Sequence, residues 1–505
     1  MRRSGSAVLS TLCLIGVAAL AACSGSTDSA GAPTPGIPTG GTATSPGPLS
    51  LSVLVFNVEY GGTSATDAVI GSIGADVVGV LESYNRLPKI AAAAGYPYYD
   101  VGLQILSKYP ILEPSGAHGL YAYLEVRPGE AIAMINTHLD YVHDGPNRLE
   151  RGATVSDVLA TERQVRLSTI RTLLPSAEHL LLDGWPLLLT GDLNEPSHLD
   201  WTARTASQHD GIGPVAWPVS EALTSAGLRD SYRQAHPDPV ADPGNTWGGV
   251  AGSHGSPRRI DYAYVGGPVE VVDSQVVGER GGPGVDLGYP HWTSDHRAVL
   301  SKLTVTPAPV PTTLALSARM VSRGDEVTAS YRMPDGLAGG RLQLEGPSSD
   351  TFPATGTSGT VQIPTSTLAA GAYRVRLLGP DGTVVATNRL TVRPRAGRIH
   401  LTTDARSYAV GQQITVHWAD GPANRWDWVA VYRAGADNPR RDDYLVWDYT
   451  GGHDAGALPP RTHGTLTFGR DQQGKPWPLP PGRYTVHYLL TDQYHSIGSA
   501  AFTVR

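Results

Sequence analysis

Residues 186–194 read PLLLTGDLN, an apolar run that places Asp192 and Asn194 at its polar end. Four other segments have a similar form, a mostly apolar run with a polar residue at or near one end: SLSVLVFNV (50–58), ADVVGVLE (75–82), AIAMINTHL (131–139) and RIDYAYV (259–265). Nearly continuous apolar strands are typical of sheets covered on both faces. Among them, TERQVRLSTIRTLLP (161–175) has apolar residues at helical spacing. The pattern therefore predicts an α/β domain over residues 49–305.

The size and charge of the chain limit the alternatives. Its 505 residues suffice for several hydrophobic cores, so we expect two to four domains. The 59 Gly and 40 Pro favour turn-rich β structure over long helices. The net charge of −7 gives no general attraction for polyanions, so binding of nucleic acid would require a local basic groove or metal ions.

The N-terminal segment has the features of a bacterial lipoprotein signal. Arg2 and Arg3 precede the apolar run LCLIGVAAL, and the following LAAC resembles a lipobox that ends at Cys23. We expect a signal peptide over 1–22, a lipid on Cys23, and a flexible Ser/Gly/Pro-rich tether over 23–48. An ordinary signal peptide with a chance Cys is the alternative. The first interpretation predicts an extracytoplasmic protein anchored to the bacterial cell membrane.

The pattern changes after TPAPVPTT, and residues 306–505 show short alternating strands. AAGAYRVRLLGPDGTVVATNRLTVR (369–393) aligns loosely with PPGRYTVHYLLTDQYHSIGSAAFTVR (480–505), which indicates a repeat, although convergent β patterning is the alternative. We expect two β-sandwich (Ig-like) domains, 306–395 and 396–505. The last one contains five Trp, either an exposed strip that binds envelope glycan or, as we favour, core residues: Trp418, Trp426, Trp428, Trp447 and Trp477.

The polar residues near the strand ends are candidates for one site, because the strand ends of a shared sheet lie close together. In chain order they are Asn57, Glu82, Asn136, His138, Asp192, Asn194, Asp261, Ser294, Asp295 and His296. Each alone also has a structural interpretation, such as an Asx turn, a buried His or a helix N-cap. As a set they offer carboxylate, amide and imidazole groups without a thiol. Such ligands suit Mg²⁺, Mn²⁺ or Ca²⁺.

The motifs FNV, LES, NTHL, GDLN, RIDY and SDH occur in this order, and the set resembles the endonuclease/exonuclease/phosphatase superfamily, the deoxyribonuclease-I-like fold. The resemblance covers about residues 50–304. It implies an α/β (α+β) fold, a four-layered α/β/β/α sandwich of two mixed sheets with helices outside. In this chain the two all-β Ig-like sandwiches would follow it.

The resemblance also implies a metal site. Glu82 resembles the family's metal-binding Glu, with Asn57 beside it, and Asp295 resembles a further ligand. Mg²⁺ or Mn²⁺ is expected, with Ca²⁺ as a further possibility, and no residue is assigned to an organic cofactor. Leu81 stands where members usually have Gln, which removes a polar neighbour of the metal ligand and would alter metal affinity.

Five residues resemble the family's catalytic groups. Asp192 and Asn194 resemble the pair that orients the attacking water and binds the phosphate. His296 resembles the catalytic His, and Asp261 the carboxylate that orients it. His138 resembles a second His that donates to the scissile phosphate or protonates the leaving oxygen.

The resulting expectation is a secreted, membrane-anchored, metal-dependent hydrolase of phosphodiester or phosphomonoester bonds, with a nuclease-like activity favoured. Its substrate would be a nucleic acid, a lipid headgroup or a small phosphate ester, because the fold alone does not select among them. One alternative is a lipid-headgroup phosphodiesterase of the sphingomyelinase type. Another is an envelope adhesion or glycan-binding lipoprotein with a vestigial catalytic domain, which the intact set of site residues disfavours.

Two roles remain possible for several polar residues near these motifs. Arg258 and Arg259 either contact a backbone phosphate or are solvated. His198 and Asp200, beyond the GDLN motif, either line the pocket or, as we favour, stabilise the loop. The polar segment 141–164 is either a substrate rim or a surface loop.

Overall fold

The computed structural model describes residues 47–505 apart from 118, 394–398, 423, 436–438, 440–442, 452–460, 470, 471 and 475. The predicted signal peptide, Cys23 and residues 23–46 of the predicted tether lie outside the described residues. Within the described residues, no helix is both long enough and apolar enough to span a membrane.

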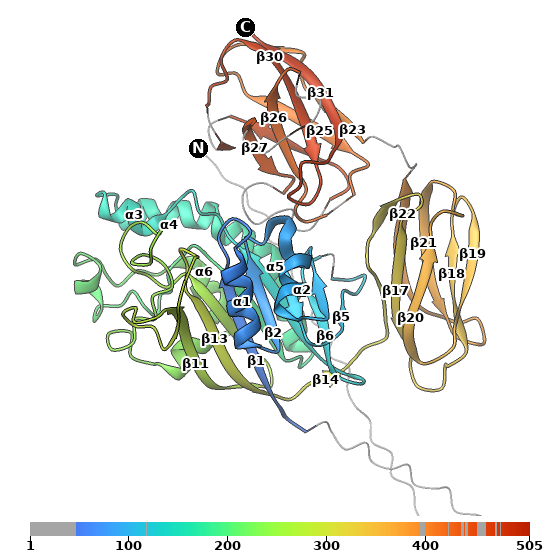
Figure 1. Ribbon diagram of the computed structural model, residues 1–505, viewed down its shortest axis with the longest axis horizontal. Helices are drawn as coiled ribbons and strands as arrows, with labels where there is room; N and C mark the ends of the chain where they lie inside the picture. The colour runs from blue at the N-terminus through green and yellow to red at the C-terminus, as the bar shows by residue number, and fades with distance from the viewer. Residues whose placement is uncertain are drawn as a thin grey trace, which may run out of the picture. The chain divides into compact units, whose positions relative to one another are not determined.

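The first part of the chain forms two sheets with helices outside them (Figure 1). In spatial order, the strands of the first sheet are β12 (Leu287–Tyr289), β11 (Val269–Glu279), β13 (Ala298–Val305), β1 (Leu49–Asn57), β2 (Val77–Leu81), β4 (Ile105–Ser107) and β3 (Tyr98–Asp100). Those of the second sheet are β5 (Ile111–Leu112), β6 (Ala122–Arg127), β7 (Glu130–His138), β8 (Leu187–Asp192), β10 (Asp261–Gly266) and β9 (Arg229–Asp230), with β14 (Ala308–Pro309) paired to β7. Strand β14 therefore joins the α/β sheet, although the sequence places residue 306 and beyond in a β-sandwich.

Three buried clusters define four layers. Val53 and Val55 of β1 pack against Met134 of β7 and Leu188 of β8, so the two sheets are stacked face to face. On the outer face of the first sheet lie α1 (Ser64–Ile73) and α2 (Leu87–Ala94). On the outer face of the second sheet lie α5 (Arg166–Leu182) and α6 (Pro218–Ser225). This arrangement confirms the predicted α/β/β/α sandwich.

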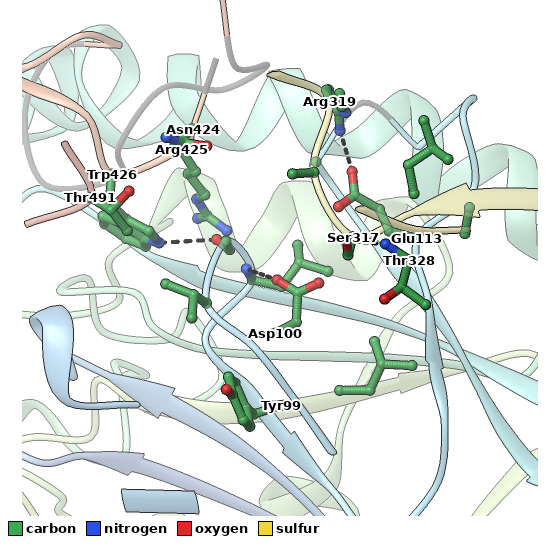
Figure 2. Close-up of a pocket in the computed structure, with 18 of the residues that line it drawn as sticks. Tyr99, Asp100, Glu113, Ser317, Arg319, Thr328, Asn424, Arg425, Trp426 and Thr491 are labelled. Atoms are coloured by element: carbon green, nitrogen blue, oxygen red, sulfur yellow. Dashed lines mark hydrogen bonds and ion pairs between the residues drawn. The ribbon is translucent and has the colours of Figure 1, made fainter. Parts of the chain in front are cut away.

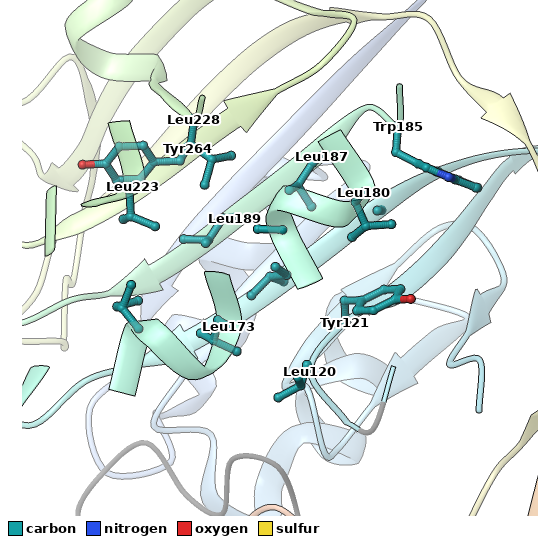
Figure 3. Packing of buried hydrophobic residues seen from close by; sticks show 14 of the residues in the cluster. Leu120, Tyr121, Leu173, Leu180, Trp185, Leu187, Leu189, Leu223, Leu228 and Tyr264 are labelled. Atoms are coloured by element: carbon teal, nitrogen blue, oxygen red, sulfur yellow. The ribbon is translucent and has the colours of Figure 1, made fainter. Parts of the chain in front are cut away.

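Figure 3 shows how the second sheet is covered: Leu173 and Leu180 of α5 and Leu223 of α6 pack near Leu187 and Leu189 of β8. The apolar run before the GDLN motif is thus buried on both faces, as its composition predicts. The remaining helical segments are η1 (Tyr84–Arg86), α3 (Gly145–Glu150), α4 (Val155–Gln164), η2 (Ala206–Gln208) and α7 (Ser231–Ala235).

The helical regions differ from the sequence expectation in two places. Residues 141–164, expected as a rim or surface loop, contain α3 and α4, each with a side-chain N-cap, Asp144 and Thr154 respectively. The segment 161–175 spans the end of α4 and the start of α5, and α5 continues through Pro175 to Leu182.

The second part of the chain forms two β-sandwiches. The first contains a three-stranded sheet and a five-stranded sheet: β15 (Thr313–Leu316), β17 (Glu326–Arg332) and β20 (Ser358–Pro364); and β16 (Met320–Ser322), β22 (Val384–Arg393), β21 (Gly371–Leu378), β18 (Gly340–Glu345) and β19 (Ser349–Ala354). The second contains a three-stranded and a six-stranded sheet: β23 (His400–Thr403), β25 (Ile414–Ala419) and β28 (Gly464–Phe468); and β24 (Ser407–Tyr408), β31 (Ser496–Val504), β30 (Gly482–Leu489), β26 (Trp428–Arg433), β27 (Tyr444–Tyr449) and β29 (Gln473–Gly474).

The two sandwiches have equivalent strand pairings. Strands β17 and β25 each form the middle of a three-stranded sheet, and the hairpins β21–β22 and β30–β31 occupy equivalent places in the larger sheets. A short strand pairs in parallel with the last strand of each unit, β16 with β22 and β24 with β31. This common topology agrees with the repeat predicted from the sequence.

The five Trp of the second sandwich do not share one environment. Trp418 lies in the core between the two sheets, as predicted. Trp426 and Trp428 are also buried, but they belong to a separate aromatic cluster with Tyr449. Trp447 packs against this cluster and is only partly buried. The cluster is therefore distinct from the sandwich core.

Candidate active site

Strand register brings the predicted residues to one edge of the two sheets. In the parallel pair β1–β2, Asn57 lies opposite Leu81, so Glu82 follows directly beside it. In the parallel pair β7–β8, His138 lies opposite Asp192. In the antiparallel pair β8–β10, Asp192 also lies opposite Asp261. Residues from five strands thus meet because β1, β2, β7 and β8 end, and β10 begins, at this edge.

His296 lies between two buried carboxylates. Its Nδ1 is 2.9 Å from Asp261 Oδ2, and its Nε2 is 3.6 Å from Asp192 Oδ2. Burial alone would lower the pKa of His296, but the two carboxylates outweigh it and raise the pKa to about 10. The imidazolium form is therefore favoured. Each of these three residues has a ligand atom within 4.8 Å of those of the others.

The two carboxylate oxygens of Asp192 have different roles. Oδ1 accepts a hydrogen bond of 2.9 Å from the backbone N–H of Asn194, which is an Asx turn. Oδ2 accepts 3.0 Å from Asn57 Nδ2 and is 3.4 Å from His138 Nε2. Although burial opposes it, His296, His138 and Asn57 together lower the pKa of Asp192 to about 2. Asp192 therefore has both roles considered for the GDLN motif: Oδ1 forms the Asx turn, and Oδ2 faces the other site residues.

Asn194 lies beside His138 at the same edge. Its Nδ2 is 3.1 Å from His138 Nε2 and donates to the carbonyl of Leu139 at 3.1 Å. Asn194 has φ of 48°, in the left-handed region that Asn tolerates better than most residues. The strained backbone turns the amide back towards β7, which places a hydrogen-bond donor next to the second His.

The three predicted metal ligands, Asn57, Glu82 and Asp295, lie in this region, and a further acidic residue, Glu59, joins them. Asn57 Nδ2 donates to Glu82 Oε1 at 3.1 Å, and the backbone N–H of Asp295 donates to Glu59 Oε2 at 3.0 Å. The pKa of Glu59 is raised by burial and by the charges of Asp295 and Glu82. The pKa of Asp295 is likewise raised by burial, with Glu82 and Asp192 adding to the effect.

The sequence analysis missed Glu59. It lies two residues after Asn57, immediately beyond the end of β1, and an acid at the end of an already selected strand is the signal that would have identified it. The mutual repulsion of Glu59, Glu82 and Asp295 fits a site for a hard divalent cation, because a cation would offset it and their oxygens are suitable ligands.

Leu81 does not contribute to the site. Its side chain is buried in the cluster between the two sheets, so the position before Glu82 offers no polar group to a metal. Asn136 is also buried, and its Nδ2 donates to the backbone carbonyls of Val80, Leu103 and Gln104. Asn136 thus has a structural role at the sheet interface.

Neither interpretation of Arg259 is correct. The side chain is buried rather than solvated, and its guanidinium pairs with Asp200 at 2.9 Å and with Asp230 at 2.7 Å. Arg258 is also buried; it pairs with Asp144 at 2.6 Å and stacks over the Trp247 ring. These cations are neutralised within the fold, so they stabilise loops instead of binding a phosphate backbone.

The loop after the GDLN motif is held by internal contacts. His198 Nδ1 is 2.8 Å from Ser220 Oγ. Asp200 accepts from Arg233 as well as from Arg259. The loop-stabilising role favoured for His198 and Asp200 is consistent with these bonds.

Two large cavities lie near the α/β sandwich. One, of about 550 Å³, is lined by Glu82 and His138 and by aromatic residues of the last β-sandwich. The other, of about 540 Å³, contains Asp100, Glu113 and Arg319 (Figure 2). Among the described residues that line this second cavity there is no predicted site residue, so the first cavity is the one that adjoins the candidate active site.

Residues 54–296 match the model of the Endonuclease/Exonuclease/phosphatase family. This part of the chain is therefore similar to that family. An uncharacterized protein of Caenorhabditis elegans, F14F9.5, is 29% identical over 240 residues, which cover 42% of this chain and 75% of that protein.

Solved structures with similarity to the chain include proteins from three organisms. An endonuclease/exonuclease/phosphatase of Beutenbergia cavernae is 19% identical with a TM-score of 0.34, covering 68% of this chain and 99% of its own. Danio rerio TDP2, complexed with a single-strand DNA product, is 17% identical with a TM-score of 0.33, covering 50% and 98%. The mannosyl-6-phosphatase Bt3783 of Bacteroides thetaiotaomicron is 17% identical with a TM-score of 0.32, covering 50% and 99%.

Proposed function

We propose that the chain is a divalent-metal-dependent phosphoesterase, with a nuclease-like activity on phosphodiesters favoured. The observation that supports this most directly is the position of His296 between Asp261 and Asp192, at 2.9 and 3.6 Å. Two further acidic residues, Glu59 and Glu82, adjoin this group. A site that combines an oriented imidazole with clustered carboxylates suits attack on an anionic ester.

The metal would be held by Glu82, Asn57 and Asp295, with Glu59 close by. When bound, a divalent cation neutralises charge on the phosphate and stabilises the leaving oxygen. Mg²⁺ and Mn²⁺ suit these carboxylate and amide oxygens, and Ca²⁺ is a further candidate. Asn57 links the two halves of the site, because its Nδ2 donates both to Glu82 and to Asp192.

The other residues would move protons and orient the reactants. Asp192 Oδ2, which lies near both His rings, is placed to orient the attacking water and accept its proton. His296, kept as an imidazolium by Asp261, would donate a hydrogen bond to a phosphoryl oxygen. The amide of Asn194 would bind the phosphate, and His138 would bind it or protonate the leaving oxygen. Such acid–base assistance is typically worth about 10²–10⁴-fold in rate.

The test uses the purified chain with Mg²⁺ or Mn²⁺ on bis-p-nitrophenyl phosphate, plasmid DNA and sphingomyelin. His296→Ala should abolish hydrolysis, whereas His179→Ala, at a largely exposed His of α5, should not change it. Activity that persists in His296→Ala or after chelation would refute the mechanism. Inactivity on all three substrates with metal bound would favour the adhesion or glycan-binding alternative.

We propose further that the protein is secreted and anchored to the bacterial membrane through a lipid on Cys23. In this proposal, residues 49–305 are the catalytic domain, and 306–395 and 396–505 are accessory domains near the envelope. A Cys23→Ala variant should be released from the membrane fraction, while the unaltered protein should incorporate labelled fatty acid. Equal membrane retention of both proteins would contradict the anchor.

A further inference from the structure

The 550 Å³ cavity beside the candidate active site has walls from two domains. The α/β sandwich contributes Glu82 and His138, with the rings of Tyr60, Tyr84 and Tyr141. The last β-sandwich contributes an aromatic wall, defined here by its lining rings: Trp426, Tyr444, Trp447, Tyr449 and Tyr494. Glu82, proposed to hold the metal, and His138, proposed to contact the phosphate, thus line the same cavity as rings of the last β-sandwich.

Hydrogen bonds from Arg425, the residue before Trp426 of the aromatic wall, connect this wall to β7, the strand that carries His138. The buried Arg425 donates from Nη1 to the backbone carbonyl of Asn136 at 2.8 Å and from Nη2 to Thr137 Oγ1 at 3.3 Å. The next residue, Trp426, donates from Nε1 to the carbonyl of Gly102 at 2.9 Å, as Figure 2 shows. Because Asn136 and Thr137 immediately precede His138 on β7, the wall is anchored within two residues of a site side chain.

The rings of the wall support one another. Trp447 meets Tyr449 with a ring-centroid distance of 5.4 Å and an interplanar angle of 88°. Trp426 meets Tyr449 at 5.4 Å and 75°. Among the lining rings of the α/β sandwich, Tyr60 and Tyr84 are stacked at 6.4 Å and 16°. The edge-to-face packing of Trp426 and Trp447 against Tyr449 fixes their ring orientations, so the wall offers a rigid aromatic surface.

The charges around the cavity do not suit a second phosphate. Arg86 is the one Lys or Arg among the described lining residues, and its guanidinium is occupied by Asp67 at 2.9 Å and by the carbonyls of Gly61 and Gly62. The lining also contains the carboxyl groups of Glu82 and Asp492. Among the described residues of the lining, a second phosphate would therefore meet no unpaired Lys or Arg, whereas a neutral group would not be repelled.

We infer that the last β-sandwich is part of the active site, and that its aromatic wall binds an uncharged ring, a base or a sugar, attached next to the scissile phosphate. A cavity of this size suits a ring-bearing group better than a trimethylammonium group, since pockets for drug-sized ligands span about 300–1,000 Å³. The inference rests on the proposed phosphoesterase function and names its substrate class. Stacking against rings is tolerant of sequence and adds binding energy near the phosphate.

The experiment compares p-nitrophenyl phosphodiesters that differ only in their second group: methyl, thymidine, glucose and choline. They share one leaving group, so the ratio of kcat/KM for the ring-bearing ester to that for the methyl ester isolates the contribution of the cavity. We expect the unaltered chain to prefer the thymidine or glucose ester. In Trp447→Leu this ratio should fall by about 5- to 150-fold, the effect expected when one stacking ring is removed.

The controls separate ring stacking from folding. Trp447→Phe keeps a ring and should retain most of the preference, and Tyr98→Ala removes an exposed ring outside the cavity and should leave it unchanged. Melting temperatures show whether each variant is folded; if Trp447→Leu melts lower, Tyr60→Leu at the 69% exposed lining ring of the α/β sandwich takes its place. The thymidine and glucose esters distinguish a base from a sugar.

The outcomes separate this inference from the function on which it rests. Metal- and His296-dependent hydrolysis with a ratio that Trp447→Leu does not change would refute the aromatic wall and leave the phosphoesterase intact. A preference for the choline ester that is lost in Trp447→Leu would overturn the assignment of an uncharged ring. Absence of hydrolysis of all four esters in the presence of metal would refute the proposed function and, with it, the inference.

Discussion

Replacement of Asp261 by Asn tests the centre of the proposed site. The Asp261 carboxylate is buried and contacts His296 Nδ1 at 2.9 Å, so an amide of equal size can occupy the same space. The change removes the nearer of the two negative charges that raise the pKa of His296. It also places an amide next to Nδ1. If the NH2 group of this amide faces Nδ1, the imidazole is held in the wrong tautomer.

The magnitude follows from these two losses. Without the Asp261 carboxylate, His296 loses its orienting partner and part of the negative charge that stabilises its imidazolium, so up to the whole acid–base contribution is at stake. That contribution is about 10²–10⁴-fold in rate, or about 3–5.5 kcal/mol of transition-state stabilisation. We therefore expect kcat of Asp261→Asn on bis-p-nitrophenyl phosphate to fall by about this factor, with metal affinity little changed.

The matched control is Asp273→Asn, which makes the same chemical change in an exposed ion pair with Lys302 at 3.3 Å. Exposed pairs contribute about 0–1 kcal/mol, so this variant should keep its activity and its melting temperature. Saturating metal and a far-ultraviolet spectrum check that Asp261→Asn is folded and loaded. A folded, loaded Asp261→Asn protein with less than about a tenfold loss of kcat would refute the role assigned to the His296–Asp261 pair.

Three further predictions concern the metal, a buried acid and the packing of the GDLN motif. Glu82→Gln should raise the metal concentration for half-maximal activity by at least about tenfold, as measured by titration with Mg²⁺ or Mn²⁺; an unchanged titration would exclude Glu82 as a ligand. The pKa of Glu195 is raised well above its usual value by burial and by Glu162, so folding favours its protonated form. Through this group the free energy of unfolding should therefore decrease as pH rises from the ordinary pKa of a Glu towards the raised pKa of the folded protein, and Glu195→Gln should make this slope shallower in urea unfolding at several pH values. A Cβ at Gly191 would lie 2.2 Å from a carbonyl oxygen of β7, so Gly191→Ala should cost about 1–3 kcal/mol of stability, whereas Gly116→Ala, which meets open space, should be nearly neutral in the same unfolding assay.

The sequence determines the α/β part of the fold through composition. The apolar runs that become β1, β2, β7, β8 and β10 have no polar face, and only a sheet covered on both sides can bury them. The strand positions follow from this pattern, whereas the four layers were implied by the resemblance that the order of the motifs carries. Residues 141–164 were harder to predict, because their helices α3 and α4 are short and depend on the N-caps Asp144 and Thr154 rather than on apolar periodicity.

Several features of the site were decided by tertiary structure alone. Sequence separation gives no information on distance, so the charges that neutralise Arg259, from Asp200 and Asp230, could not be inferred from the chain order. The position of Glu59 beyond β1 was a signal in the sequence, but its contact with the backbone N–H of Asp295, 236 positions away, could be known only from the structure.

The sequence by itself determined the chemistry available at the site, because residue types at strand ends fix which ligands and proton carriers exist. Tertiary structure decided which of them meet: register places Asp192 opposite both His138 and Asp261, and the fold brings His296 to the same carboxylates. It also decided that rings near residue 447 share a cavity with Glu82. Side chains far apart in the chain act together only when packing holds them within a few ångströms, and packing depends on the whole chain.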